Sequence, residues 1–217
     1  MEALSEKNRL YLAFMRDMLE VCETLGLRWY IWGGMVADIL EGNFQREHGD
    51  LDGFVENLEN NVKALSAALT QRGYEAAFNE QFSILTARRD PIHAAFNPLR
   101  INGGIAEWKH IGDQGSVFFP FDWLDGEPRS FLGESVRTSG IRFEYMFRTN
   151  TPLLNPQWTE NRPKDADAIA YYKAALLREG IDPRSLAGRF WTYNPFWFHR
   201  GYEDFFLPKF ASREESD

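Results

Sequence analysis

The chain has a single cysteine, no long apolar run and fewer cations than anions. Cys22 cannot form an internal disulfide, which excludes a disulfide-stabilised scaffold and favours a reducing compartment, the cytoplasm. Across 217 residues, 24 Lys and Arg stand against 32 Asp and Glu, and the formal charge of −8 argues against a protein that coats nucleic acid. Charged residues such as Glu6, Arg9 and Arg16 interrupt the N-terminal segment, so we expect neither a signal peptide nor a membrane span there.

What is present indicates a globular α+β protein. A chain of this length buries roughly 70% of its unfolded surface on folding, which is enough for a core without structural metal. Helical periodicity, with Gly26, Gly73 and Gly180 as stops, predicts helices over 1–26, 57–72 and 163–179. Runs rich in aromatic and β-branched residues predict strands over 28–32, 50–56, 82–87, 92–101 and 141–147.

A change in composition after Asn150 divides the chain in two. We expect a core over 1–149 and a C-terminal helical and aromatic-rich segment over 150–217 that packs on it. Ten aromatic residues lie between Phe190 and Phe210. They either pack over the core, because large aromatic side chains chiefly supply buried area, or stack on a ring of a bound molecule.

Asp50 and Asp52 are the most informative pair in the chain. In a strand, residues two apart point to the same face, so the two carboxylates would converge on one spot. Hard oxygen ligands in this arrangement suit Mg²⁺, which is typically held by one or two carboxylates together with water and substrate phosphates. The alternative interpretation is a pair of solvated surface carboxylates, because acidic residues at this spacing are common.

A glycine pair, Gly33-Gly34, stands between a predicted strand and a predicted helix. At such a turn the backbone can approach a phosphate closely, and the N–H groups at a helix start favour an anion. The glycine pair alone would be an ordinary turn. Together with the aspartates seventeen residues later, it predicts a site that holds a phosphate beside a metal.

The string GGMVADILEGNFQREHGDLD, from Gly33 to Asp52, resembles the nucleotidyltransferases that modify aminoglycosides and lincosamides. These enzymes belong to the DNA polymerase β-like nucleotidyltransferase superfamily. Their pattern is a glycine pair followed by T-R-x-H-x-D-[IL]-D, which Arg46, His48 and Asp50 match here, while Gln45 stands in place of Thr.

The resemblance implies a nucleotidyltransferase fold, a mixed β-sheet flanked by helices. It also implies Mg²⁺ or Mn²⁺ held by the catalytic residues Asp50 and Asp52, with a nucleoside triphosphate, for which we expect ATP, bound by the glycine pair. A hydroxyl of a small acceptor, antibiotic-like or sugar-like, would attack the α-phosphate and release pyrophosphate. Catalysis of this kind rests on positioning and on electrostatic stabilisation by the metal.

Three further residues are candidates for nucleotide binding, and each has a structural alternative. Arg46 either contacts phosphate oxygens or forms a surface ion pair with Glu41 or Glu47. His48 either contacts the triphosphate or holds the loop that presents Asp50, and the second role is favoured because a neutral His adds little phosphate affinity.

Asp38, on the helix after the glycines, is expected to fix the same loop by hydrogen bonding. Lys164 either reaches the phosphates from the second part of the chain or is an exposed lysine in the first turn of a helix.

One position departs from the family. Its members carry a third carboxylate on a later strand, in a stretch like V-D-[LV]-H-P-[LV], and aligning that stretch with residues 94–99 puts Ala95 at the carboxylate position. A positioned general base contributes typically 10²- to 10⁴-fold in rate. Two hypotheses follow: an active transferase whose third carboxylate comes from Asp90, Glu107 or Glu144, or a catalytically degenerate protein that binds nucleotide without turnover.

Overall fold

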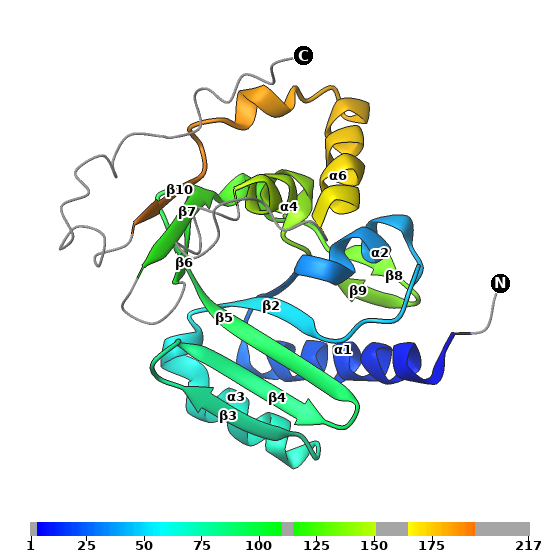
Figure 1. Cartoon of the computed structure of the whole chain (residues 1–217). Coiled ribbons are helices and arrows are strands. Elements are labelled where there is room, and N and C mark those ends of the chain that lie inside the picture. Colours follow the sequence, from blue (N-terminus) through cyan, green and yellow to red (C-terminus); the bar gives the residue numbers. More distant parts are fainter. Residues whose placement is uncertain (1–3, 110–114, 151–164, 194–217) are drawn as a thin grey trace.

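The computed structural model describes residues 4–109, 115–150 and 165–193, which form a mixed sheet with helices on both faces (Figure 1). Its helices are α1 (Glu6–Leu25), α2 (Val36–Glu41), α3 (Leu58–Gln71), α4 (Gly140–Thr149) and α6 (Ala166–Arg178). Its strands are β1 (Trp29–Trp32), β2 (Leu51–Glu56), β3 (Glu75–Asn79), β4 (Ile84–Arg89), β5 (Ile92–Asn102), β6 (Ile105–Lys109), β7 (Ser116–Pro120), β8 (Arg129–Phe131), β9 (Glu134–Val136) and β10 (Trp191–Tyr193). Strands β8 and β9 pair with each other as a separate two-stranded sheet. The predicted α+β class, with a mixed sheet flanked by helices, is confirmed.

Strand β5 organises the sheet because it is long enough to pair with three other strands. One edge of β5 runs parallel to β2, while the other edge pairs antiparallel with β4 near its start and with β6 near its end. Strand β1 covers the outer edge of β2, and β3 covers that of β4. Beyond β6 lie β7 and then β10, so the C-terminal aromatic segment adds an edge strand to the sheet.

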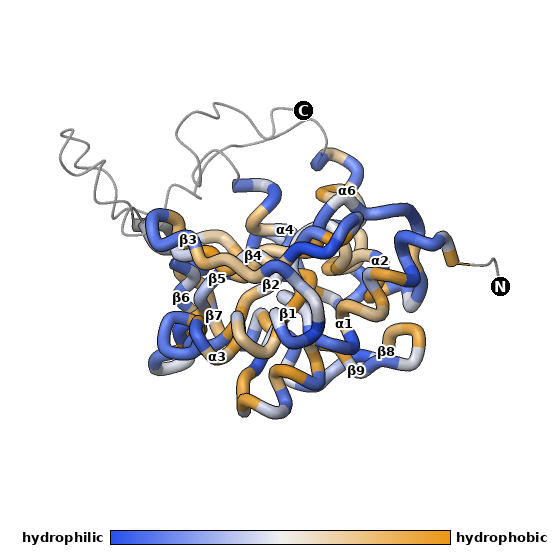
Figure 2. The backbone as a smooth tube through the Cα atoms, turned by 90° about the horizontal axis from the view of Figure 1, so that it is seen from below, coloured by the Kyte–Doolittle hydropathy of each residue, from blue (hydrophilic) through white to orange (hydrophobic). Residues whose placement is uncertain are grey.

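Each face of the sheet carries its own hydrophobic cluster. On one face Phe96 packs with residues of α1 and α3, among them Phe14 and Leu65. On the other face Phe54 and Phe143 pack with the side chains of α4, α6 and the end of the described chain. In Figure 2 apolar and polar stretches alternate along α1 and its neighbours, as expected of elements that bury one side.

The predicted first and second helices are confirmed, and their ends have local causes. Ser5 begins α1 by accepting a hydrogen bond from the Asn8 backbone N–H, and Gly26 ends the helix in the left-handed conformation at φ 65°. Gly73, at φ 82°, follows α3 in the same way. The predicted helix over 163–179 corresponds to α6, since its last turn also gives way to a left-handed glycine.

The prediction of a strand over 141–147 is wrong, because these residues form most of α4. Apolar residues alternate with Arg142 and Glu144 in this segment, which imitates the period of a strand. In the structure the helix buries Glu144 and Arg148 as an i,i+4 ion pair. Polar residues that are buried do not mark the solvent face, so the helical period is hidden in the sequence.

Several sequence predictions concern residues outside the described part. These are the first part of the predicted C-terminal segment, over 151–163, the candidate phosphate ligand Lys164, and the aromatic segment beyond Tyr193. Within the described part, Phe190 is fully buried in the second cluster. In this part of the chain no helix is both long and apolar enough to cross a membrane.

Candidate active site

The two aspartates lie at the start of β2. Asp52 is the second residue of the strand and is half-buried, while Asp50 is exposed and immediately precedes the strand. Burial raises the pKa of the Tyr11 hydroxyl, and the negative charges of Asp50 and Asp52 raise it further. Both carboxylates therefore act electrostatically on one hydroxyl.

The register of the sheet defines the row of residues that contains Asp52. Asp52 pairs with Trp32 of β1 on one side and with Ala95 of β5 on the other, and Ala95 in turn pairs with Thr86 of β4. Side chains of directly paired residues point to the same face of a sheet. Ala95 therefore stands beside Asp52 on the same face, where the family resemblance implies a carboxylate.

Gly33 brings the glycine turn against Asp52. It is buried, adopts φ 84°, and a Cβ placed on it would lie 3.1 Å from Asp52 Oδ2. Any larger residue would be strained and would press on the carboxylate. The glycine turn and Asp52, which were predicted from their spacing to belong to one site, thus lie close together.

Gly34 is exposed and lies against Arg46. A Cβ on Gly34 would lie 3.0 Å from Arg46 Nη2 and 3.4 Å from His48 Nδ1. Arg46 Nη1 donates to the Glu47 carbonyl oxygen at 3.1 Å, and no ion pair of Arg46 with the Glu41 or Glu47 carboxylate occurs among the described residues. The surface ion pair considered for Arg46 is therefore absent from this part of the chain.

The helix expected after the glycines is short. A 3₁₀ turn over Gly33–Met35 leads into α2, which has six residues. A macrodipole needs aligned peptide units over several turns, so the helix contributes little to anion binding here. Electrostatic support for a phosphate at this turn rests instead on the Arg46 guanidinium.

Asp38 and His48 form a buried pair that holds the loop between α2 and β2. His48 Nε2 lies 2.8 Å from Asp38 Oδ2, and the Gln45 backbone N–H donates to the same oxygen at 3.1 Å. Both side chains are almost fully buried. This geometry agrees with the loop-fixing role favoured for Asp38 and His48. His48 lies beside Gly34 and precedes Asp50 by two residues.

A second polar network reaches the glycine turn from α4. Glu144 Oε1 accepts hydrogen bonds from the Gly33 backbone N–H and from Ser139 Oγ, both at 2.7 Å. Glu144 Oε2 accepts from Arg148 at 3.2 Å, and Arg148 donates to Asp165 Oδ1 at 2.7 Å. Burial raises the pKa of Glu144 despite these donors. The Gly33 amide, expected to face a phosphate, is thus occupied by a carboxylate.

The structure describes residues 4–109, 115–150 and 165–193, and within these ranges no three His, Cys, Asp or Glu side chains gather around a metal-sized space. Two carboxylates, Asp50 and Asp52, remain as donors at the start of β2. Such a donor set fits Mg²⁺, which is commonly held by one or two carboxylates and completes its shell with water and substrate phosphates. It does not provide a metal cage made of protein alone.

The family can be assigned at this point. A family model for aminoglycoside-2″-adenylyltransferase matches residues 14–150, which is more than half of the chain. The chain belongs to this family. The match includes the glycine turn, the aspartate pair and Glu144, and it ends one residue after α4.

Solved structures show the same fold. The crystal structure of ANT(2″)-Ia in complex with adenylyl-2″-tobramycin aligns with a TM-score of 0.59 and 15% identity, covering 79% of this chain and 92% of that chain. The lincomycin-bound lincosamide antibiotic adenylyltransferase LnuA aligns with a TM-score of 0.56 and 18% identity, covering 79% and 98% respectively. A search of curated protein sequences found no significant match.

In this member of the adenylyltransferase family, the three residues considered as substitutes for the third carboxylate lie in different places. Asp90 is exposed in the turn between β4 and β5. Glu107 pairs with Arg100, whose position on β5 has the opposite parity to Ala95, so Glu107 faces away from Asp52. Glu144 reaches Gly33, and of the three it is the one in direct contact with the glycine turn.

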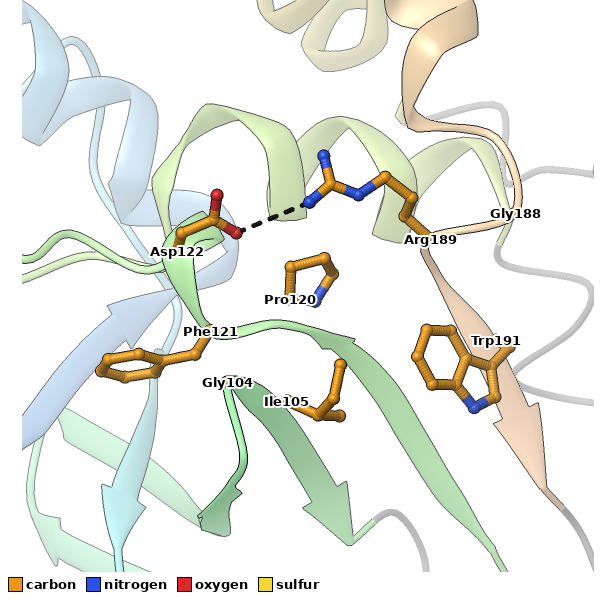
Figure 3. Close-up of a pocket in the computed structure, with 8 residues that line it drawn as sticks. All are labelled: Gly104, Ile105, Pro120, Phe121, Asp122, Gly188, Arg189 and Trp191. Atoms are coloured by element: carbon orange, nitrogen blue, oxygen red, sulfur yellow. Dashed lines mark ion pairs between the residues drawn. The ribbon is translucent and has the colours of Figure 1, made fainter.

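A pocket of about 500 Å³ lies elsewhere, at the far end of β5 (Figure 3). Pro120 forms its floor, Phe121 and Trp191 stand on opposite sides, and Asp122 pairs with Arg189 at 3.9 Å across the top. The β5–β6 turn, where this pocket opens, is about 20 Å along β5 from the level of Asp52. The pocket is therefore separate from the candidate active site.

Sequence reasoning did not predict the surroundings of Tyr11 and Glu144. Tyr11 comes from α1 and carries no local signal, because its helix reads simply as amphipathic. Glu144 was one of three acidic candidates, and its contact with Gly33 joins residues 111 positions apart. Only the packing of α4 on the sheet brings that pair together.

Proposed function

We propose that this chain is a Mg²⁺-dependent nucleotidyltransferase that moves a nucleoside monophosphate from a triphosphate to a hydroxyl of a small acceptor. The observation that carries the proposal is the close approach of the glycine turn to the second aspartate, in which Gly33 lies against the Asp52 carboxylate. Arg46 lies beside Gly34 at the exposed end of the same turn. The position of Arg46 and Asp52 on either side of the glycine turn supports the proposal that a metal-bound triphosphate binds there.

Asp50 and Asp52 would hold the metal, either Mg²⁺ or Mn²⁺. When bound, such an ion neutralises triphosphate charge and stabilises the charge that develops on the leaving pyrophosphate. The Arg46 guanidinium can form forked hydrogen bonds to phosphate oxygens, which suits it to orient the triphosphate. The buried Asp38–His48 pair keeps both Arg46 and Asp50 in place by fixing the loop between them.

The reaction is an in-line displacement at the α-phosphorus. A bond forms between the acceptor oxygen and phosphorus while the bond from phosphorus to the bridging oxygen breaks, and pyrophosphate leaves with that electron pair. The acceptor hydroxyl loses its proton in the same step. In this family the third carboxylate helps remove that proton, and Ala95 cannot do so.

The acceptor class follows from the relatives. ANT(2″)-Ia was solved with adenylyl-2″-tobramycin and LnuA with lincomycin, both hydroxylated antibiotics. We therefore propose an antibiotic-like or sugar-like acceptor, with ATP as the donor because the family is named for adenylyl transfer. Lys164 is kept as a proposed phosphate ligand on the strength of the resemblance alone.

A second candidate function is nucleotide binding without turnover. The specific observation in its favour is the register that places Ala95 beside Asp52. Under this hypothesis the aspartate pair still binds the metal and triphosphate, while the acceptor proton has no positioned base. The two candidates agree on binding and differ on catalysis.

A pyrophosphate-release assay separates them. The native protein is incubated with Mg²⁺ or Mn²⁺, each of the four triphosphates, and panels of aminoglycosides, lincosamides and sugars. Release that disappears in Asp52→Asn supports the transferase. A rise in melting temperature with Mg²⁺ and triphosphate, lost in Asp52→Asn and unaccompanied by release, supports binding alone. If the native protein shows no pyrophosphate release and no thermal shift, both proposals are overturned.

A further inference from the structure

Glu144 is a buried carboxylate, and both of its oxygens accept hydrogen bonds from other groups of the protein. Its side chain is 0% exposed, and its two oxygens accept from the Gly33 backbone N–H, the Ser139 hydroxyl and the Arg148 guanidinium. A buried carboxylate costs several kcal/mol unless donors of this kind satisfy it. Glu144 is therefore held in one orientation by the groups around it.

The carboxylate joins two elements that carry the predicted chemistry. On one side it holds the amide of Gly33, the residue whose missing side chain makes room for Asp52. The hydrogen bond from Gly33 to Glu144 and the close approach of Gly33 to Asp52 share one residue, so the two carboxylates cannot be more than about 9 Å apart. A shift of Glu144 would thus be transmitted to Asp52 through Gly33.

On its other side the carboxylate leads to α6. Arg148 bridges Glu144 to Asp165, which lies at the start of α6 and is 2% exposed. The chain of contacts from Gly33 to Asp165 contains one cation and two anions, all buried. Removing the charge of Glu144 would leave Arg148 and Asp165 as a balanced pair, so a neutral substitution at Glu144 is compatible with folding.

Glu144 does not have the exposure required of a metal ligand or a general base. Both its oxygens are committed to donors within the protein, and no part of its surface reaches solvent. A base that removes the acceptor proton must come within hydrogen-bonding distance of that hydroxyl. The role available to Glu144 acts through the backbone.

We propose that Glu144 is a positioning residue that fixes the Gly33 amide, and with it the glycine turn against Asp52, while Arg148 and Asp165 tie the same turn to α6. The proposal rests on the nucleotidyltransferase function proposed above. It assigns the first amide of the glycine pair to the protein's own carboxylate and leaves Gly34 and Arg46 for the phosphates. Nucleotide geometry then depends on a helix outside the strand–turn–helix motif.

The test compares three variants. Glu144→Met keeps the approximate size and removes every acceptor. Glu144→Gln keeps one oxygen for Gly33 and disrupts the contact with Arg148. Ser139→Ala is the matched control, because it removes a different donor from the same carboxylate oxygen and leaves the Gly33 bond in place.

Three readouts are measured: melting temperature, hydrogen exchange of the Gly33 amide by NMR, and kcat and KM from pyrophosphate release. In Glu144→Met we expect the Gly33 amide to exchange at least about tenfold faster. We expect kcat to fall about 10²-fold, since misplacement by about 1 Å has that effect. Glu144→Gln should recover most of the Gly33 protection, and Ser139→Ala should lower the melting temperature without lowering kcat.

Two outcomes would overturn the proposal. One is unchanged Gly33 exchange in folded Glu144→Met, and the other is a loss of kcat in Ser139→Ala as large as that in the Met variant. If Glu144→Met does not fold, Glu144→Gln is compared with Ser139→Ala by the same criteria. If the native protein shows no binding and no turnover, the proposed function fails, and the Gly33 exchange rates still decide whether Glu144 fixes the turn.

Discussion

Restoring a carboxylate at residue 95 would test the placement of the whole site. Ala95 is paired with Asp52 on the adjacent parallel strand, so in Ala95→Asp the two carboxylates would be about 5 Å apart, the spacing of neighbouring strands. Two like charges at that distance repel by roughly 1 kcal/mol in water-like surroundings and by about 3 kcal/mol at an effective dielectric near 20. Ala95 is half-buried, which places the expected cost between these limits.

The stability of Ala95→Asp should therefore depend on divalent metal. Without Mg²⁺ we expect its unfolding free energy, measured by urea denaturation, to be about 1–3 kcal/mol below that of the neutral variant Ala95→Asn. Saturating Mg²⁺ should remove most of this difference, because the ion binds the folded state and not the unfolded chain. If the native protein is the slow or inactive member that Ala95 suggests, turnover should rise by about 10²- to 10⁴-fold in Ala95→Asp.

A matched control lies in the same row of the sheet. Ala77 is exposed on β3 and is two strands away from Ala95, through Thr86. Ala77→Asp should show no Mg²⁺-dependent stability. The reasoning is refuted if Ala95→Asp and Ala95→Asn have equal stabilities at every Mg²⁺ concentration, because the carboxylate would then not face Asp52.

Three further changes have expected outcomes. Gly33→Ala should lower stability by about 1–2 kcal/mol through left-handed strain and should also reduce the triphosphate-induced thermal shift, because its Cβ meets Asp52. Gly26 has φ 65° and open space around it, so Gly26→Ala should lower stability in the same way but keep the triphosphate-induced thermal shift. Equal thermal shifts in the two variants would contradict the contact between Gly33 and Asp52. His48→Ala should cost about 1–3 kcal/mol in urea denaturation, since it leaves a buried carboxylate with one partner fewer, and a neutral effect would speak against the loop-fixing role. Because burial raises the pKa of Glu144, the native state binds a proton there more readily than the unfolded chain does. The stability of the native protein relative to Glu144→Gln should therefore be greatest below about pH 4 and decline as pH rises. Parallel stability curves for these two proteins between pH 4 and pH 7 would contradict that sign.

The sequence was sufficient for the elements whose signals are local. Periodicity and glycine stops predicted α1 and α3, and the alternation around Asp52 predicted β2. The predictions of these elements succeeded because each depends on spacing along one element. The register places Ala95 beside Asp52, and its correspondence to the family's third carboxylate stays a prediction.

Long-range polar contacts could not be predicted. Residues 141–147, which include Glu144, were predicted to form a strand, whereas tertiary packing buries Glu144 and Arg148 in α4 and supplies their partners from Gly33 and Asp165. Helix prediction from periodicity assumes that charged residues face solvent, and a buried ion pair does not meet this assumption. The contact between Gly33 and Glu144 is also long-range, so the sequence predicted a phosphate at the glycine turn, whereas in the folded protein the Gly33 amide donates to the Glu144 carboxylate.

Phe190 lies outside the family match but is buried in the same hydrophobic cluster as residues inside it. The family match ends at residue 150, yet Tyr172, Leu176 and Phe190 fill the same cluster as Phe143. The residues that the family model matches therefore supply only part of this hydrophobic cluster. A fragment that stops at residue 150 would keep Gly33, Gly34, Asp50 and Asp52 but would expose the aromatic face of α4, so we expect it to be less stable than the whole chain.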